Sequence, residues 1–164
     1  MKDPLIKIKP RTRHNVQLAT CNLRLAVLTQ AIGKSKDRSE GIMKIRIKIG
    51  KLSMDAELNE TATAKKIAGA LPIKTGFNTW GDEIYFAIPV TAKLDESAKE
   101  VVEVGDLGYW PTGKAFCIFF GQTPVSKPGK IMPASAVNLI GKVLGDATQF
   151  KKVMSESQVT LEAV

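Results

Sequence analysis

Histidine and cysteine are scarce in this chain, and their scarcity excludes several kinds of site. The only histidine is His14, and the two cysteines are Cys21, in a basic N-terminal segment, and Cys117, inside an apolar run. Cysteines in such different surroundings form neither a disulfide framework nor a metal-ligand spacing. Without a histidine in the patterned part of the chain, that part lacks the ligands of a zinc site and cannot form a Ser/His/Asp triad. We therefore expect no metal and no cofactor.

Long apolar segments are also absent. No uninterrupted apolar run approaches the roughly 20 residues that a membrane-spanning helix needs. The 164 residues, 44% hydrophobic and 24% charged, have the composition of an ordinary globular protein and the length for one sizeable core. These features predict a soluble, cytoplasmic protein with one folded domain and no membrane partner. They carry no indication of its oligomeric state.

Positive charge is concentrated in the first quarter of the chain. The formal net charge is +8, and residues 1–41 contribute +6 of it, which leaves the remaining residues nearly neutral. Sequence-independent binding to nucleic acid requires a basic face. The body of the chain has no such excess of basic residues, so we rank nucleic-acid binding through the N-terminal segment third among three functional hypotheses.

Residues 1–41 show no strand alternation, and their one apolar stretch, residues 18–32, is interrupted by Arg24. That interruption argues against a secretory signal, while the basic, acid-poor composition is similar to that of organellar transit peptides and of disordered tails. A second interpretation is that translation begins at Met43. In either case we expect a poorly packed basic leader, because a polar segment cannot offset its ordering entropy. The folded domain is predicted to span residues 42–164.

Hydrophobic alternation begins at Met43. Ile45, Ile47 and Ile49 alternate with basic residues, a pattern that predicts a strand with one buried face. Many short strands and no βαβ rhythm predict a mainly β fold, a closed antiparallel barrel with two short helices. The expected strands are 43–49, 53–58, 77–80, 83–89, 101–104, 107–110, 115–120, 134–143 and 157–162; the expected helices are 62–71, capped by Asn59 or Thr61, and 146–154; and 122–133 is expected to form a long surface loop.

Four stretches carry a family resemblance: Asn78–Phe86, Val104–Pro111, Ala115–Pro124 and Pro133–Asn138. Through them, residues 42–164 resemble the uncharacterised prokaryotic cyclophilin-like proteins. This resemblance implies a compact β-barrel related to the peptidyl-prolyl isomerases. A shared fold does not carry an activity with it, so the site has to be compared residue by residue.

The isomerase site of true cyclophilins holds a proline beside an arginine, with a tryptophan and a histidine nearby. The only arginine of residues 42–164 is Arg46, on the first strand, and residues 83–88, where the resemblance places the catalytic arginine, contain no lysine or arginine. Residues 121–136 contain neither tryptophan nor histidine, and only Phe116 matches a pocket aromatic. Because the cation that would stabilise the twisted amide is missing, we do not expect isomerase activity.

Aromatic residues form the one constellation that favours a site. Core packing is the first explanation for them. However, Tyr85 lies on the strand face opposite Ile84 and Phe86, where it is suited to line an apolar cleft with a polar rim. The carboxylates Asp82 and Asp106 are assigned to turns. The candidate ligand-binding residues are Trp80, Glu83, Tyr85, Tyr109, Phe116 and Gln122.

The leading functional hypothesis is a module that binds a small molecule or a peptide in this cleft without catalysing a reaction. The alternative is enzymatic, either a peptidyl-prolyl isomerase with a rebuilt site or an amide-handling enzyme of the wider cyclophilin-like group. The sequence does not identify the ligand.

Overall fold

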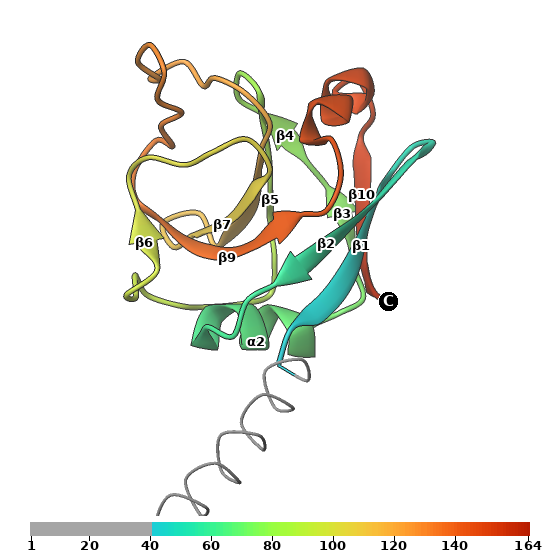
Figure 1. The fold of residues 1–164 in the computed structure, drawn as a ribbon. Helices are drawn as coiled ribbons and strands as arrows, with labels where there is room; N and C mark the ends of the chain where they lie inside the picture. Colours follow the sequence, from blue (N-terminus) through green and yellow to red (C-terminus); the bar gives the residue numbers. More distant parts are fainter. Residues whose placement is uncertain (1–40) are drawn as a thin grey trace, which may run out of the picture. The chain divides into compact units, whose positions relative to one another are not determined.

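A computed structural model describes residues 41–164 of the chain (Figure 1). They form one antiparallel sheet in the order β3-β10-β1-β2-β9-β7-β8-β5-β4, with the short strand β6 paired to β9. The strands at the two ends of this order, β3 and β4, are separated in sequence only by Phe77, so the ends of the sheet meet in a nearly closed barrel. The predicted mainly β barrel with two helices is therefore confirmed. The predictions about the leader concern residues outside the described part.

The strand and helix bounds follow the hydrophobic alternation closely in the first hairpin and less closely later. The strands are β1 Met43–Ile49, β2 Leu52–Leu58, β3 Ile73–Gly76, β4 Asn78–Thr79, β5 Glu83–Ala87, β6 Ala98–Lys99, β7 Asp106–Trp110, β8 Ala115–Phe119, β9 Val137–Val143 and β10 Gln158–Ala163; the helices are α2 Ala62–Gly69 and the 3₁₀-helix η1 Ala147–Val153.

The two helices lie at opposite ends of the barrel in Figure 1. Thr61 caps α2 by accepting a hydrogen bond from the backbone N–H of Ala64 at 3.2 Å, and Asp146 caps η1 by accepting one from Thr148 at 3.0 Å. Ile67 of α2 is fully buried against the barrel. Of the two caps considered for the first helix, the structure selects Thr61. Within residues 41–164, no helix has the length and apolar character that crossing a lipid bilayer requires.

The inner faces of the strands build a single barrel core. In β5 the alternation is as predicted, since Ile84 and Phe86 are buried in this core while Tyr85 points away from it. The rings of Phe86 and Phe116 stack inside the barrel with centroids 5.3 Å apart. Packing of this kind supplies most of the stability of a domain this size.

A second hydrophobic cluster covers the outer face of part of the sheet. We call it the outer cluster; its buried members come from β8, from β9 and from Val102, with further half-buried side chains around them. They are Val102, Ala115, Cys117, Phe119 and Val137, with Tyr85, Trp110, Ile131 and Leu139 packed against them. Since β8 is buried on both faces, it explains the unbroken apolar run at residues 115–120.

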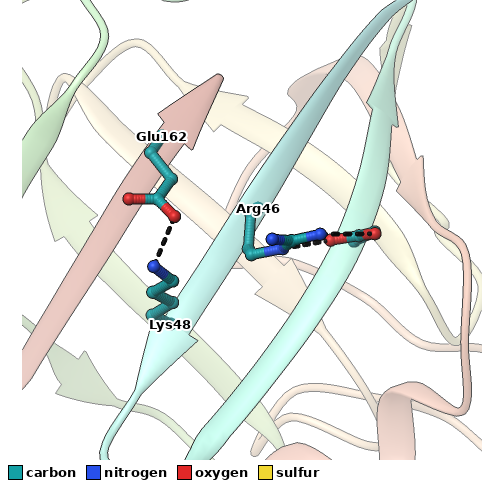
Figure 2. A network of polar contacts seen from close by, with 4 residues as sticks. Arg46, Lys48 and Glu162 are labelled. Carbon is teal, nitrogen blue, oxygen red and sulfur yellow. Dashed lines mark hydrogen bonds and ion pairs between the residues drawn. The ribbon is translucent and has the colours of Figure 1, made fainter. Parts of the chain in front are cut away.

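The opposite side of the barrel has a polar outer face, shown in Figure 2. On β1, Arg46 forms a bidentate pair with Asp55 of β2, with N–O distances of 2.7 and 3.2 Å, and Lys48 lies 2.5 Å from Glu162 of β10. These side chains are roughly half exposed, so water solvates them as well as their partners.

Two parts of the predicted pattern differ from the structure. β3 and β6 were not predicted, because they are short and show no clear alternation. Residues 101–104 were expected to be extended, but only Val102 pairs there, in an isolated bridge with Ile131. A buried polar network instead organises the preceding segment: the Asn138 amide donates to the Lys93 carbonyl at 2.8 Å and accepts from the Asp95 N–H at 2.9 Å.

Candidate ligand-binding cleft

A cleft of about 200 Å³ opens on the outer face of the sheet, next to the outer cluster. Trp80, Glu83, Tyr85 and Trp110 line it. Its remaining wall consists of Pro133, Ala134 and Val137, which come from the end of the β8–β9 connection and the start of β9. Clefts for drug-sized ligands are larger, so this one suits a small molecule or a single side chain.

The tight β4–β5 hairpin positions Trp80 and Glu83. The Trp80 N–H donates to the Glu83 carbonyl at 2.9 Å, and Gly81 turns the chain with φ of 61°. A Cβ atom on Gly81 would lie 2.7 Å from the carbonyl oxygen of Gln122, which also accepts from the Asp82 N–H at 2.9 Å. The position therefore requires glycine for both conformation and space, and the hairpin tip is fixed against the chain after β8.

Tyr85 and Glu83 share the outer face of β5 because they are two residues apart on a strand. Across the ladder, Tyr85 is paired with Cys117 and Glu83 with Phe119 of β8. Both β8 partners are buried in the outer cluster. The Glu83 carboxylate and the Tyr85 ring therefore project from a strand that is paired with buried residues of the outer cluster.

Trp110 is held in place from two sides. Its indole Nε1–H donates to the Ser135 hydroxyl at 2.7 Å. On the other side the ring lies so close to Gly113 that a Cβ atom there would be 2.6 Å from the ring carbons Cε3 and Cζ3. The ring is therefore preorganised at the cleft wall, which reduces the entropy lost when a ligand contacts it.

Glu83 is the only carboxylate among the described residues that line the cleft. Only 5% of the residue is exposed, and within residues 41–164 its carboxylate takes part in no salt bridge. Burial raises the pKa of Glu83 to about 7, although a hydrogen bond with Cys117 offsets part of the rise. For Cys117 itself, burial, followed by the nearby Glu83 charge, raises the thiol pKa well above its ordinary value, so this cysteine is not a reactive nucleophile.

The structure separates the six candidate residues into three groups. Trp80, Glu83 and Tyr85 line the cleft. Tyr109 and Phe116 are fully buried in the barrel core, on the other side of the sheet, and the Tyr109 hydroxyl donates to the Val90 carbonyl at 2.6 Å. Gln122 is exposed and does not line the cleft. The cleft thus lies outside the barrel and not in its mouth.

The candidate residues predicted from the sequence do not include Trp110, which the structure places in the cleft wall. The signal that identifies it is the alternation along β7: Leu107 and Tyr109 share the inner face, so Trp110 faces the outer side of the sheet. Pro133, Ala134 and Val137 carried no such signal, since they reach the cleft through a long connection. No lysine, arginine or histidine is among the described residues that line the cleft. Nor do residues 41–164 bring together three or more metal-ligating side chains.

Comparisons with known proteins agree with this architecture. A family model described as cyclophilin-like matches residues 43–162. A solution structure of a hypothetical protein from Archaeoglobus fulgidus is similar to the chain with 43% sequence identity and a TM-score of 0.65, covering 76% of this chain and 96% of the archaeal one. A comparison with curated proteins gives no match.

Proposed function

The chain belongs to the cyclophilin-like family, and we propose that it is a binding module that takes a small molecule or a peptide side chain in the cleft, without prolyl isomerase activity. One observation carries the proposal. Both tryptophans of the chain converge with Tyr85 and a buried carboxylate on one concave surface outside the packed core. Apolar walls around a single polar group are the usual composition of a ligand site.

The surroundings of the only described arginine support the absence of isomerase activity. Arg46 lies on β1 and is engaged by Asp55, while the cleft is built on β5, β7 and β9. A cation at the cleft would be needed to stabilise the charge that develops on a twisting imide. A carboxylate in its place stabilises the opposite charge.

Binding is tested through the tryptophans themselves. Because the chain has only two, and both line the cleft, its indole NMR signals and its fluorescence report on this site alone. Titration with a library of small molecules and short peptides is expected to shift both indole signals with at least one class of compound. A library that shifts neither signal at millimolar concentration would contradict the proposal.

The isomerase assay addresses the second half of the proposal. In the presence of micromolar protein, a proline-containing test peptide is expected to isomerise no faster than without it, with a time constant of tens to hundreds of seconds at room temperature. A rate that rises in proportion to protein concentration would overturn this part and leave the binding role intact.

A second candidate function rests on the protonation of Glu83. A carboxyl group with a pKa of about 7 at a cleft is suited to give or take a proton near neutral pH, as an amide-handling enzyme requires. Turnover of a panel of small amides that disappears in Glu83→Gln, while the indole shifts persist, would favour this candidate over simple binding.

A further inference from the structure

The composition of the cleft indicates more than a general affinity for apolar groups. Three aromatic side chains, Trp80, Tyr85 and Trp110, come from the β4–β5 turn, from β5 and from β7, so they approach the cleft from different elements. The fourth of these wall residues is Glu83, the only charged residue among them, and it is 95% buried. No cationic side chain of residues 41–164 neutralises that carboxylate.

An aromatic ring attracts a cation through the negative charge of its faces, and the attraction increases when water is excluded. A carboxylate attracts the same cation directly, and charge-assisted hydrogen bonds are stronger than neutral ones. Both features repel an anion. We infer that the cleft selects a small organic cation, an ammonium or methylated ammonium group, which contacts Trp80, Tyr85 and Trp110 and pairs with Glu83. This inference rests on the proposed function and adds the chemical class of the ligand.

Three other carboxylates of the domain show why Glu83 is distinctive. Asp55 is paired with Arg46, and Asp82, adjacent in sequence, lies 3.2 Å from Lys151. Asp106, on β7, which is separated from β5 by β8, accepts a hydrogen bond from the Glu103 N–H at 2.8 Å and lies 3.9 Å from Lys142. Each of these has a partner within the chain. Glu83 has only its hydrogen bond with Cys117 and no cationic partner within residues 41–164. Burying a carboxylate without a cation beside it is costly, and a ligand cation would supply one.

The volume limits the cation further. A cleft of about 200 Å³ accommodates a trimethylammonium or a butylammonium group but not a nucleotide or a polyamine in folded form. The cation has two possible sources, a free amine or the side chain of a lysine in a peptide. Choline represents the free amine, and Nα-acetyl-lysine methylamide represents the lysine side chain of a peptide.

The experiment uses the full chain and compares isosteric probes. Choline and 3,3-dimethylbutan-1-ol have the same shape, but only choline is charged. Their dissociation constants are measured from the two tryptophan indole NMR signals at pH 8, where Glu83 is ionised. Choline is expected to bind at least about tenfold more tightly than the alcohol. Nα-acetyl-lysine methylamide, whose side-chain ammonium is free, and its neutral norleucine analogue form the peptide arm. In each arm the affinity for the charged probe is divided by the affinity for the neutral one. The arm with the larger ratio identifies the source of the cation.

Two variants test whether the Glu83 charge, and not the overall charge of the protein, causes the preference for choline. Glu83→Gln keeps the size of the side chain and is expected to reduce the preference for choline to about twofold or less while leaving the alcohol affinity within about twofold. Glu162→Gln removes the same charge from the far side of the barrel and is expected to leave the preference unchanged. Unaltered indole signals in the unliganded variants check that the cleft is intact.

Acidification provides a second readout. The other titratable side chains on the elements around Glu83 are Asp82 in the β4–β5 turn, Tyr85, Asp106, Tyr109, Cys117 and Lys142. Asp82 and Asp106 are paired with lysines, and Cys117 stays protonated through neutral pH because its pKa is raised. Lowering the pH from 8 to 5.5 protonates Glu83 and is expected to weaken choline binding by about tenfold, with no change for the alcohol.

The outcomes are distinguishable. Equal affinities for choline and the alcohol at pH 8, or an unchanged preference in Glu83→Gln, would overturn the cation inference while the binding role remains. If neither probe nor the library shifts the indole signals, the proposed function itself fails.

Discussion

The two halves of the barrel use the outer faces of their strands differently. In the half formed by β1, β2 and β10, which we call the solvated half, the outward side chains include two ion pairs in contact with water (Figure 2). In the half formed by β5, β7, β8 and β9, the covered half, the outer face is buried under the outer cluster and carries the cleft. A polar group costs little in the first setting and much in the second, so a lone carboxylate is informative only in the covered half.

The largest expected effect tests whether the outer cluster is a true second core. Phe119 is fully buried on the outer face of β8, as Phe116 is on the inner face. Phe119→Ala is expected to lower the free energy of unfolding by about 3–5 kcal/mol, close to the loss for Phe116→Ala, because both leave cavities in packed surroundings. Chemical denaturation of the two variants measures this. A loss below about 1 kcal/mol for Phe119→Ala alone would show that the covering segment is loosely attached.

The next effect concerns the pH dependence of stability through Glu83. Its folded-state pKa of about 7 lies above the ordinary value of 4.5, so the folded state binds the proton more tightly than the unfolded state does. This contribution to stability is complete below pH 4.5 and is lost as the pH rises to about 7. Glu83→Gln removes the dependence. Between pH 4 and pH 8 the variant is expected to gain up to about 3 kcal/mol relative to the original protein.

Denaturation of both proteins across this pH range provides the measurement. Comparing the variant with the original protein removes the contributions of the other acids, such as Asp95 and Asp146, whose pKa values are lowered and which act at lower pH. Parallel pH profiles for the two proteins would mean that the Glu83 carboxylate is solvated after all, which would remove the contrast between the halves at this position.

The contrast also explains how much of the molecule the sequence predicted. In the solvated half, period-two alternation survives because one face meets water, so Ile45, Ile47 and Ile49 were assigned to the core correctly. In β8 both faces are buried, so the run at 115–120 indicates a strand but not which residues face inward. The pattern therefore predicts Phe116 as a cleft residue, whereas it lies in the core. For β5 the alternation remained visible, and Tyr85 and Glu83 were placed on the cleft side.

A smaller effect tests the placement of Trp110. Gly113→Ala introduces a methyl group 2.6 Å from the indole carbons, so the ring has to shift toward Ser135 or away from the cleft. We expect a loss of about 1–2 kcal/mol in stability, as for other overpacked sites. We also expect a change in the Trp110 indole signal and a weaker affinity for any ligand of the cleft. Gly129→Ala, at a glycine with open space around it, is the control for a change of glycine in an exposed loop, although its positive φ adds some strain.

The smallest effect is expected at the ion pair of the solvated half. Arg46 lowers the pKa of Asp55 by a hydrogen bond and by its charge, so the pair contributes to stability above the ordinary pKa and loses that contribution on acidification. Both side chains are about 40% exposed, however, so water solvates them in the folded chain nearly as well as in the unfolded chain. Asp55→Asn is therefore expected to change the unfolding free energy less than Gly113→Ala does, and any change is expected to disappear at high salt. Denaturation at low and high salt distinguishes the cases. A salt-insensitive loss as large as that of Phe119→Ala would place the pair in a desolvated setting and would remove the physical difference between the two halves.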